Sequence, residues 1–171
     1  SSNSYMKLDQ KALQDLEVFN SSNGKANAPN LYRTLDFSKT AMGARALRSW
    51  LTRPLIDAGD IHRRQEILAA FFDDQGVRAT TQGLLNQVSD LERLTNRIRT
   101  NTATPRDLAA LRAGLAVIPQ ILETLPVGVT PGGSVIGRIH SSSEALDLLN
   151  AAIPDDPSIS VGEGSAIREG F

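Results

Sequence analysis

The segment TPRDLAALRAGLAVIPQILETL, residues 104–125, decides the fold class because it carries a complete set of helix signals. Thr104 is a favourable N-cap residue, and Pro105 at the first helical position loses no hydrogen bond, since the N–H there has no helical partner. Asp107 lies three residues after the cap, near the positive end of the helix dipole. Apolar side chains then recur at alternating steps of three and four residues: Leu108, Leu111, Leu115, Ile118, Leu122 and Leu125. This spacing predicts one amphipathic helix with a seam like that of a coiled coil.

Pro119 lies inside this predicted helix. Its ring nitrogen carries no hydrogen, so the bond to the carbonyl of Leu115 is missing and the ring crowds that carbonyl. A proline in this position usually bends a helix. We therefore expect one bent helix over residues 105–125, and not two helices separated by a loop.

Helix signals continue on both sides of this segment. Toward the N-terminus, capping residues stand before periodic apolar runs at Asp9, Thr40, Asp57 or Asp60, and Asp90. A short helical turn is predicted over residues 31–35. The helix after it should stop near Thr52, because Arg53 precedes Pro54 and a residue before proline is disfavoured in the helical conformation.

The C-terminal part carries one more helix signal and a turn signal. Ser141-Ser142-Ser143-Glu144 has the pattern of a capping box before a last helix that ends at Pro154. Residues 158–169 alternate around Gly162-Glu163-Gly164, which predicts a small hairpin. The predicted fold class is therefore all-α, an irregular multi-helical array with a small C-terminal hairpin.

Three predicted helices carry apolar stripes that we expect to be buried. The stripes are Met42, Ala46, Leu47, Trp50 and Leu51 after Thr40; Ile61, Leu68, Phe71 and Phe72 in the next helix; and Leu91, Leu94 and Ile98 after Asp90, with Glu92, Arg93, Arg97 and Arg99 facing outward. Gly43 costs its helix roughly 1 kcal/mol relative to Ala. We expect another backbone to approach closely there.

Composition narrows the class of protein. The 171 residues are 40% hydrophobic and contain no cysteine, which excludes disulfide scaffolds and thiolate metal sites. The N-terminal residues lack a signal peptide, and no apolar run approaches the ~20 residues that span a bilayer. The net charge is −1, with +4 over residues 26–112 and −5 over residues 113–171. These features predict an intracellular protein and argue against a dedicated nucleic-acid binder.

No arrangement of residues typical of a catalytic, cofactor-binding or metal site is present. The two histidines, His62 and His140, have no metal-type spacing. In the glycine-rich stretch after Gly162, Ile167 stands where a dinucleotide-binding motif has its third glycine. Pro131-Gly132-Gly133 is not followed by the lysine of a Walker loop. We therefore predict a module that is not itself an enzyme.

One stretch of the sequence carries a distinctive set of motifs, LYRTLD at 31–36, KTAMGARALRSWL at 39–51 and RPL at 53–55. This stretch resembles the signature of the MutS family of DNA mismatch-repair proteins. The resemblance continues through residues 61–72, DLERL at 90–94, TPRDL at 104–108 and IREGF at 167–171, and begins at Leu8-Asp9 and Leu16-Glu17. Residues 12–15 depart from the family, which has a Thr-Arg-Arg-Asn-like run there.

The resemblance implies the helical core, or lever, domain, which links a DNA-gripping clamp to an ATPase. It implies a parent protein that binds mismatched DNA, ATP and Mg²⁺ and forms dimers, in the cytoplasm of a bacterium or in a eukaryotic nucleus or organelle. The Phe-x-Glu motif for mismatch reading and the Walker loop are both absent here. We therefore expect residues 1–171 to be one fragment of that domain, with a first helix and loop (1–30), a main helical array (31–125) and a linker, last helix and hairpin (126–171).

The resemblance also points to residues with a structural or interdomain packing role: Met42, Gly43, Arg45, Leu47, Trp50, Pro54, Leu94, Pro105 and Asp107. Two other functions stay open from the residues alone. A free-standing helical adaptor would bind another protein through the seam of residues 108–125. A DNA-binding surface would use Arg45, Arg48, Arg93 and Arg97.

Overall fold

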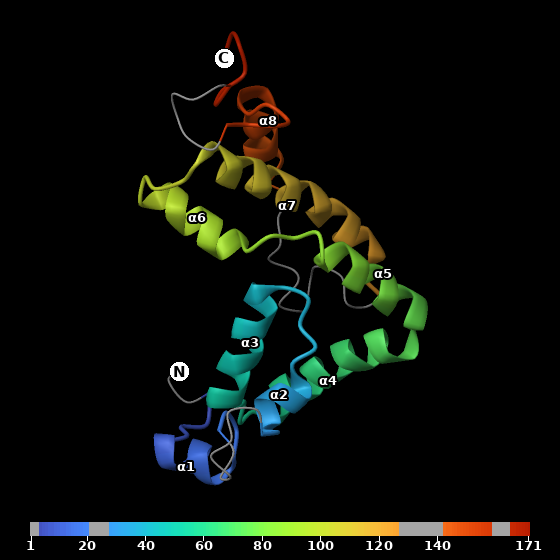
Figure 1. Cartoon of the computed structure of the whole chain (residues 1–171). Coiled ribbons are helices and arrows are strands. Elements are labelled where there is room, and N and C mark those ends of the chain that lie inside the picture. The colour runs from blue at the N-terminus through green and yellow to red at the C-terminus, as the bar shows by residue number, and fades with distance from the viewer. Residues whose placement is uncertain (1–3, 21–27, 127–141, 159–164) are drawn as a thin grey trace. The chain divides into compact units, whose positions relative to one another are not determined.

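The computed structural model describes residues 4–20, 28–126, 142–158 and 165–171. Within these residues, 64% lie in helices and none lies in a strand, which confirms the all-α prediction (Figure 1). The helices are α1 (Gln10–Asp15), α2 (Leu31–Leu35), α3 (Ala41–Thr52), α4 (Ala58–Asp73), α5 (Gln75–Leu85), α6 (Leu91–Arg99), α7 (Pro105–Thr124) and α8 (Ser143–Ala152). The chain forms two compact units, an N-terminal unit of Ser1–Ala69 and a C-terminal unit of Ala70–Phe171.

The predicted N-caps are confirmed at the start of five helices, α1, α3, α4, α6 and α7. In each case a side-chain oxygen accepts a hydrogen bond from a backbone N–H of the first turn, as for Asp9 with Ala12 (2.7 Å) and Thr40 with Gly43 (3.0 Å). Asp57 rather than Asp60 caps α4, because its Oδ1 accepts from the Asp60 N–H at 2.9 Å. Asp90 and Thr104 cap α6 and α7 in the same way. Asp74, which was predicted only as part of a turn, also caps a helix, α5.

The N-terminal unit is organised around two short backbone connections. After α1 the chain turns at Glu17, which has a φ of 50°, and the Val18 N–H donates to the Leu13 carbonyl at 3.0 Å. This turn buries Val18, the most enclosed side chain of the unit. A second connection pairs the N-terminal segment with residues 54–56, where the Met6 N–H donates to the Pro54 carbonyl at 2.8 Å.

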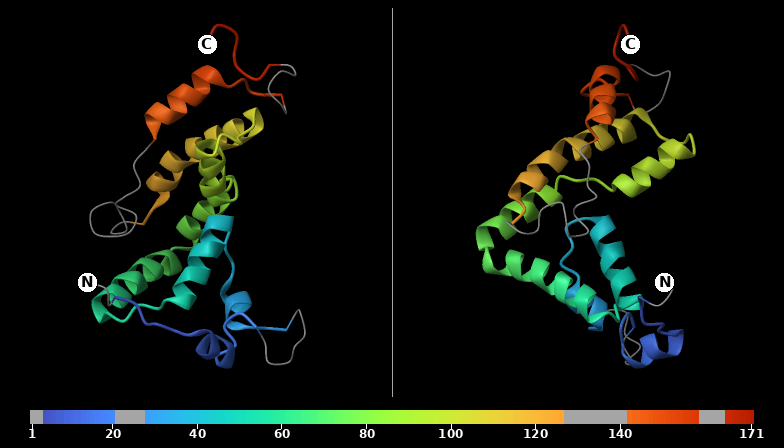
Figure 2. Two further views of the ribbon diagram at one scale, coloured as in Figure 1. Left: turned by 90° about the vertical axis from the view of Figure 1, so that its left-hand side faces the viewer. Right: turned by 180° about the vertical axis from the view of Figure 1, so that it is seen from behind.

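The C-terminal unit is built around α7, which packs against α5, α6 and α8. Both views in Figure 2 show α8 lying beside α7. The core of this unit contains Leu94 (1% exposed), Val117 and Ile153. Thr81 and Thr124 join α5 to the end of α7 through a hydrogen bond of 3.4 Å between their hydroxyls. The helix α7 is continuous through Pro119, so the prediction of one helix instead of two is confirmed.

The expected burial of the α3 and α4 stripes is wrong within the described residues. Trp50 is 46% exposed and Phe72 76% exposed, and no residue of α3 or α4 is fully buried. The seam residues of α7 are only half-buried, whereas Gly114 and Val117 on the same helix are buried. Apolar periodicity identifies which face of a helix is apolar, but it does not show whether another part of the chain covers that face.

Two predictions about the last helix have different outcomes. Ser142, with a φ of −82° and a ψ of 54°, makes no capping hydrogen bond. The capping box is therefore not formed on Ser142, and Ser141 lies outside the described residues. The predicted hairpin turn at 162–164 also lies outside them, although the Ser158 N–H does donate to the Ser165 carbonyl at 3.2 Å.

Candidate functional site

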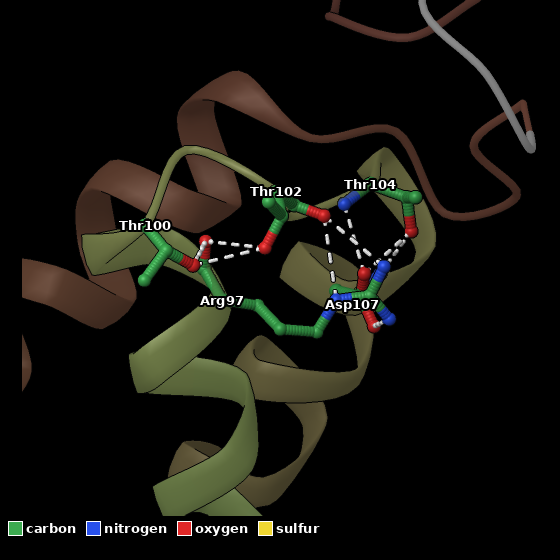
Figure 3. A network of polar contacts seen from close by, with 5 residues as sticks. All are labelled: Arg97, Thr100, Thr102, Thr104 and Asp107. Atoms are coloured by element: carbon green, nitrogen blue, oxygen red, sulfur yellow. Dashed lines mark hydrogen bonds and ion pairs between the residues drawn. The ribbon is translucent and has the colours of Figure 1, made fainter.

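A network of polar contacts joins the end of α6 to the start of α7 (Figure 3). After α6 the chain turns at Asn101, which has a φ of 55°, and the Thr102 N–H returns to the Arg97 carbonyl at 2.9 Å. Asparagine tolerates this left-handed conformation better than most residues. The turn directs the Thr102 carbonyl toward the Arg97 side chain, whose Nε and Nη2 donate to it at 3.3 and 3.1 Å.

Arg97 reaches onward to Asp107, the third residue of α7. Its Nη1 lies 3.1 Å from Asp107 Oδ1, while Oδ2 accepts from the Thr104 N–H at 2.8 Å and from the Thr104 hydroxyl at 2.7 Å. With the reciprocal bond from the Asp107 N–H to Thr104 Oγ1, this completes a capping box. One carboxylate therefore caps α7 and anchors it to α6.

The pKa of Asp107 lies below its ordinary value. Burial acts to raise this pKa, but the hydrogen bonds from Thr104 and the charges of Arg97 and Arg93 together outweigh burial. The carboxylate is thus ionised at neutral pH, as the ion pair with Arg97 requires. The sequence predicted the position of Asp107 at the helix start but placed Arg97 facing outward, which is wrong.

In the N-terminal unit, arginines lie on aromatic rings. The Arg48 guanidinium is 4.1 Å from the Phe19 ring centroid, and the Arg64 guanidinium is 3.8 Å from that of Trp50. Contacts of this kind contribute about 0.5–1 kcal/mol at exposed sites. Trp50 is therefore covered partly by a charged side chain and not by an apolar core.

A tyrosine and a carboxylate are also paired at the end of α2. The hydrogen bond between Tyr32 and Asp36 raises the pKa of Tyr32 and, together with bonds from Ser38, lowers the pKa of Asp36. This pairing fixes the end of α2, where the Asp36 N–H donates to the Tyr32 carbonyl at 2.9 Å.

The predicted site residues divide between the two units. Leu94, Pro105 and Asp107 are all buried in the α6–α7 pair of the C-terminal unit. The others lie in the N-terminal unit and none is fully buried: Met42, Gly43, Arg45, Leu47, Trp50 and Pro54. Among the described residues, the three atoms nearest to a Cβ built at Gly43 belong to the side chains of Thr40, at 3.2 Å, and Ser38, so the expected backbone is not its closest neighbour.

Sequence reasoning missed three charged residues that join elements of the C-terminal unit. Arg112 on α7, Asp155 after α8 and Arg168 near the C-terminus converge at the end of α8. The family-like motif IREGF contains Arg168, so the sequence did indicate this residue. No local pattern indicated Arg112, because its partners lie more than forty positions further along the chain.

Comparison with known proteins places this helical array. The family described as MutS domain III matches residues 11–169. The chain belongs to the MutS domain III family.

The relatives of this MutS domain III chain are much longer proteins. DNA mismatch repair protein MutS of Dehalococcoides mccartyi is 38% identical over 168 residues, which are 98% of this chain and 20% of that protein. The MutS protein of Thermotoga sp. is 36% identical over 98% of the chain, and that of Salinibacter ruber 34% over all of it. The chain thus spans about a fifth of the length of the relatives it matches.

The described residues of this MutS domain III form neither a metal-binding cluster nor a membrane-spanning helix. No group of three or more His, Asp or Glu side chains in them is placed to hold a metal ion. None of the helices they form is long and apolar enough to cross a bilayer.

Proposed function

We propose that this chain is a non-catalytic transmission module of a MutS-type DNA mismatch-repair protein, connecting a DNA-gripping clamp with an ATPase domain. Its family and the names of its relatives support a place in mismatch repair. In this proposal the parent protein binds mismatched DNA, ATP and Mg²⁺ through other domains and forms dimers. The module itself passes conformational change between those domains.

The observation that carries the proposal is the way α7 is held. Near its start, Asp107 is bonded to Arg97 of α6; in its first half, Arg112 donates to the Ile153 carbonyl at the end of α8; at its end, Thr124 contacts Thr81 of α5. A helix is stiff along its axis, and closely packed elements shift between discrete arrangements instead of yielding smoothly. A helix of 20 residues held at three points can therefore move as one piece with its neighbours.

Weakening one of these points in the full-length protein tests the proposal. Arg97→Gln removes the link between α6 and α7 but leaves the capping box of α7 in place. We expect basal ATP hydrolysis and duplex affinity within about twofold of the wild type, but a smaller change in ATP turnover on adding mismatched duplex. Such coupling energies are typically about 1–3 kcal/mol.

Arg99→Gln is the matched control, because Arg99 lies on the same helix and bonds only to Asn96 of that helix among the described residues. It should leave the coupling unchanged. An Arg97→Gln protein that remains folded by circular dichroism and keeps the wild-type coupling would contradict the proposal.

A free-standing adaptor is the second candidate, and exposed apolar side chains favour it. Phe37 and Leu68 in the N-terminal unit and Phe72 in the C-terminal unit are more than two-thirds exposed. Such side chains mark contact surfaces for other protein segments. The reading frame that encodes the chain separates the two functions, because a frame without an ATPase domain supports the adaptor and contradicts the transmission module.

At least two of the four arginines considered for DNA binding contact other residues of the chain. Arg48 lies on Phe19 and Arg97 is bonded to Asp107. We therefore propose that the 171-residue chain alone binds matched and mismatched duplex equally weakly. Fluorescence anisotropy with the two duplexes checks this, and tight, mismatch-selective binding would show that the module reads DNA directly.

A further inference from the structure

Two guanidinium groups converge on the C-terminal end of α8. Arg112 Nη1 donates to the Ile153 carbonyl at 2.7 Å and Arg168 Nε donates to the same carbonyl at 2.9 Å. Arg112 Nη2 also lies 3.3 Å from the Pro154 carbonyl, and the Nη2 atoms of both arginines lie within 3.3 Å of Asp155 Oδ1. Arg112 comes from α7 and Arg168 from the C-terminal segment, residues 165–171, so three parts of the chain meet at this point.

The hydrogen bonds to the backbone carbonyls contribute more to holding the end of α8 than the ion pairs with Asp155 do. The Asp155 side chain is 89% exposed, and ion pairs with such exposed groups contribute little. Ile153, by contrast, is buried, and the last carbonyls of a helix have no partner within it. The Arg112 side chain is only 15% exposed. Two cations on these carbonyls supply the missing donors and oppose the negative end of the helix dipole.

The C-terminal segment depends on Arg168 for its place. Its large apolar side chains, Ile167 and Phe171, are exposed and bury little surface. Arg168 contributes through its backbone as well, because its N–H donates to the Ala152 carbonyl at 2.7 Å. One residue thus supplies three hydrogen bonds from the segment to the end of α8.

We infer that Arg112 and Arg168 form a two-arginine clasp on the end of α8, in which Arg112 is the fixed half and Arg168 the half that can release. Arg112 holds α8 on α7, and Arg168 holds the C-terminal segment on α8. Displacement of that segment therefore reaches α7 through the Ile153 carbonyl that the two arginines share. This last step rests on the proposed function, whereas the clasp itself does not.

Amide hydrogen exchange measured by NMR on the 171-residue chain tests the clasp. In Arg168→Gln the amide of Arg168's position should exchange at least about tenfold faster, while the amides of α8 change by less than about twofold. Arg168→Lys should behave like Arg168→Gln, because lysine has a methylene group at the position of Nε, the atom that donates to the Ile153 carbonyl. Arg112→Gln should speed exchange in both α8 and the C-terminal segment.

Two further variants serve as controls. Asp155→Asn should change exchange in the segment by less than about threefold, since the exposed carboxylate contributes little. Glu169→Gln alters the charge of the neighbouring residue, for which the described residues offer no hydrogen bond or ion pair, and should have no effect. Unchanged exchange in Arg168→Gln, or full retention of protection in Arg168→Lys, would overturn the clasp.

The role in transmission has a separate readout in the full-length protein, the change in ATP turnover on adding mismatched duplex. Arg168→Gln should reduce this change as Arg97→Gln does. If Arg97→Gln reduces it and Arg168→Gln does not, the path through the clasp is wrong and the proposed function stands. If neither variant reduces it, the proposed function itself fails, whatever the exchange rates show.

Discussion

At the scale of single residues, local pairs could be predicted from the sequence and distant ones could not. Asp107 stands three residues after Thr104, and that spacing predicted the cap and the place of the carboxylate in the first turn of α7. Its bond to Arg97 depends on a left-handed turn at Asn101 that brings the two helix ends together. An arginine on a helix surface usually faces solvent, so the residues around Arg97 do not indicate that it pairs with Asp107.

Asp107→Asn should make stability less sensitive to acid. The pKa of Asp107 is lowered in the folded chain, so its contribution is fully present above the unfolded value of 3.8 and is lost as pH falls through the lower folded value. We expect the variant to be less stable by about 1–3 kcal/mol at neutral pH. Urea denaturation at several pH values should show this difference shrinking below about pH 4.

Asp147→Asn on the exposed side of α8 is the control and should match the wild type at every pH. A wild-type chain that loses no more stability in acid than Asp107→Asn would contradict the pairing with Arg97 and Thr104.

Two helical glycines give a second comparison between single residues. A Cβ at Gly83 of α5 would meet no atom within 4 Å, whereas one at Gly114 of α7 would lie 2.8 Å from Leu91 Cδ2. Gly83→Ala should therefore raise the free energy of unfolding by up to about 1 kcal/mol, the usual difference in helix propensity. Gly114→Ala should gain less, because Leu91 must move. Equal gains in thermal denaturation would show that α7 and Leu91 are not in close contact.

At the scale of elements, helix boundaries were predicted well because they depend on adjacent residues. The starts of α3, α6 and α7 and the end of α3 lie where caps and the Arg53-Pro54 pair predicted them. Burial was predicted poorly. The apolar stripes of α3 and α4 show which face of each helix is apolar, but not whether another part of the chain packs against that face. Leu94 is the exception, because its partner helix α7 follows directly along the chain.

Replacing Pro119 tests how α7 is built. Pro119→Ala restores the N–H that can donate to the Leu115 carbonyl and removes the clash of the ring. We expect the free energy of unfolding to rise by about 1 kcal/mol or more, measured by urea denaturation followed by circular dichroism. Pro105→Ala is the matched control and should give no gain, because the amide at the first helical position has no acceptor within the helix. A loss of stability in Pro119→Ala would indicate that packing around α7 requires the bend expected at Pro119.

At the scale of the whole molecule, the sequence predicted the helical class and the family but not the division into two units. The boundary between Ala69 and Ala70 falls inside α4, where no proline, glycine or change of composition marks it. It follows from contacts between residues far apart in sequence, such as Arg112 with Ile153. Contacts of this range are set by packing, so local patterns do not reveal them.

Residues 70–171 alone should fold cooperatively. This unit contains its own core of Leu94, Val117 and Ile153, and its polar connections among α6, α7 and α8 lie within it. Thermal denaturation of the isolated segment followed by circular dichroism should give a single sigmoidal transition. A gradual loss of helix without a transition would show that the unit needs residues 1–69.

The stack of Arg64 on Trp50 has a practical consequence for spectroscopy. Trp50 is the only tryptophan of the chain, and the two tyrosines, Tyr5 and Tyr32, lie in the same N-terminal unit. Near-ultraviolet absorbance and intrinsic fluorescence of tyrosine and tryptophan therefore originate entirely from residues 1–69, while far-ultraviolet circular dichroism records both units. Because Trp50 is half exposed and in contact with a guanidinium, its emission should shift when that stack opens. The unlabelled chain thus carries a tyrosine and tryptophan signal for the N-terminal unit alone, so melting curves from fluorescence and from far-ultraviolet circular dichroism separate the unfolding of the two units.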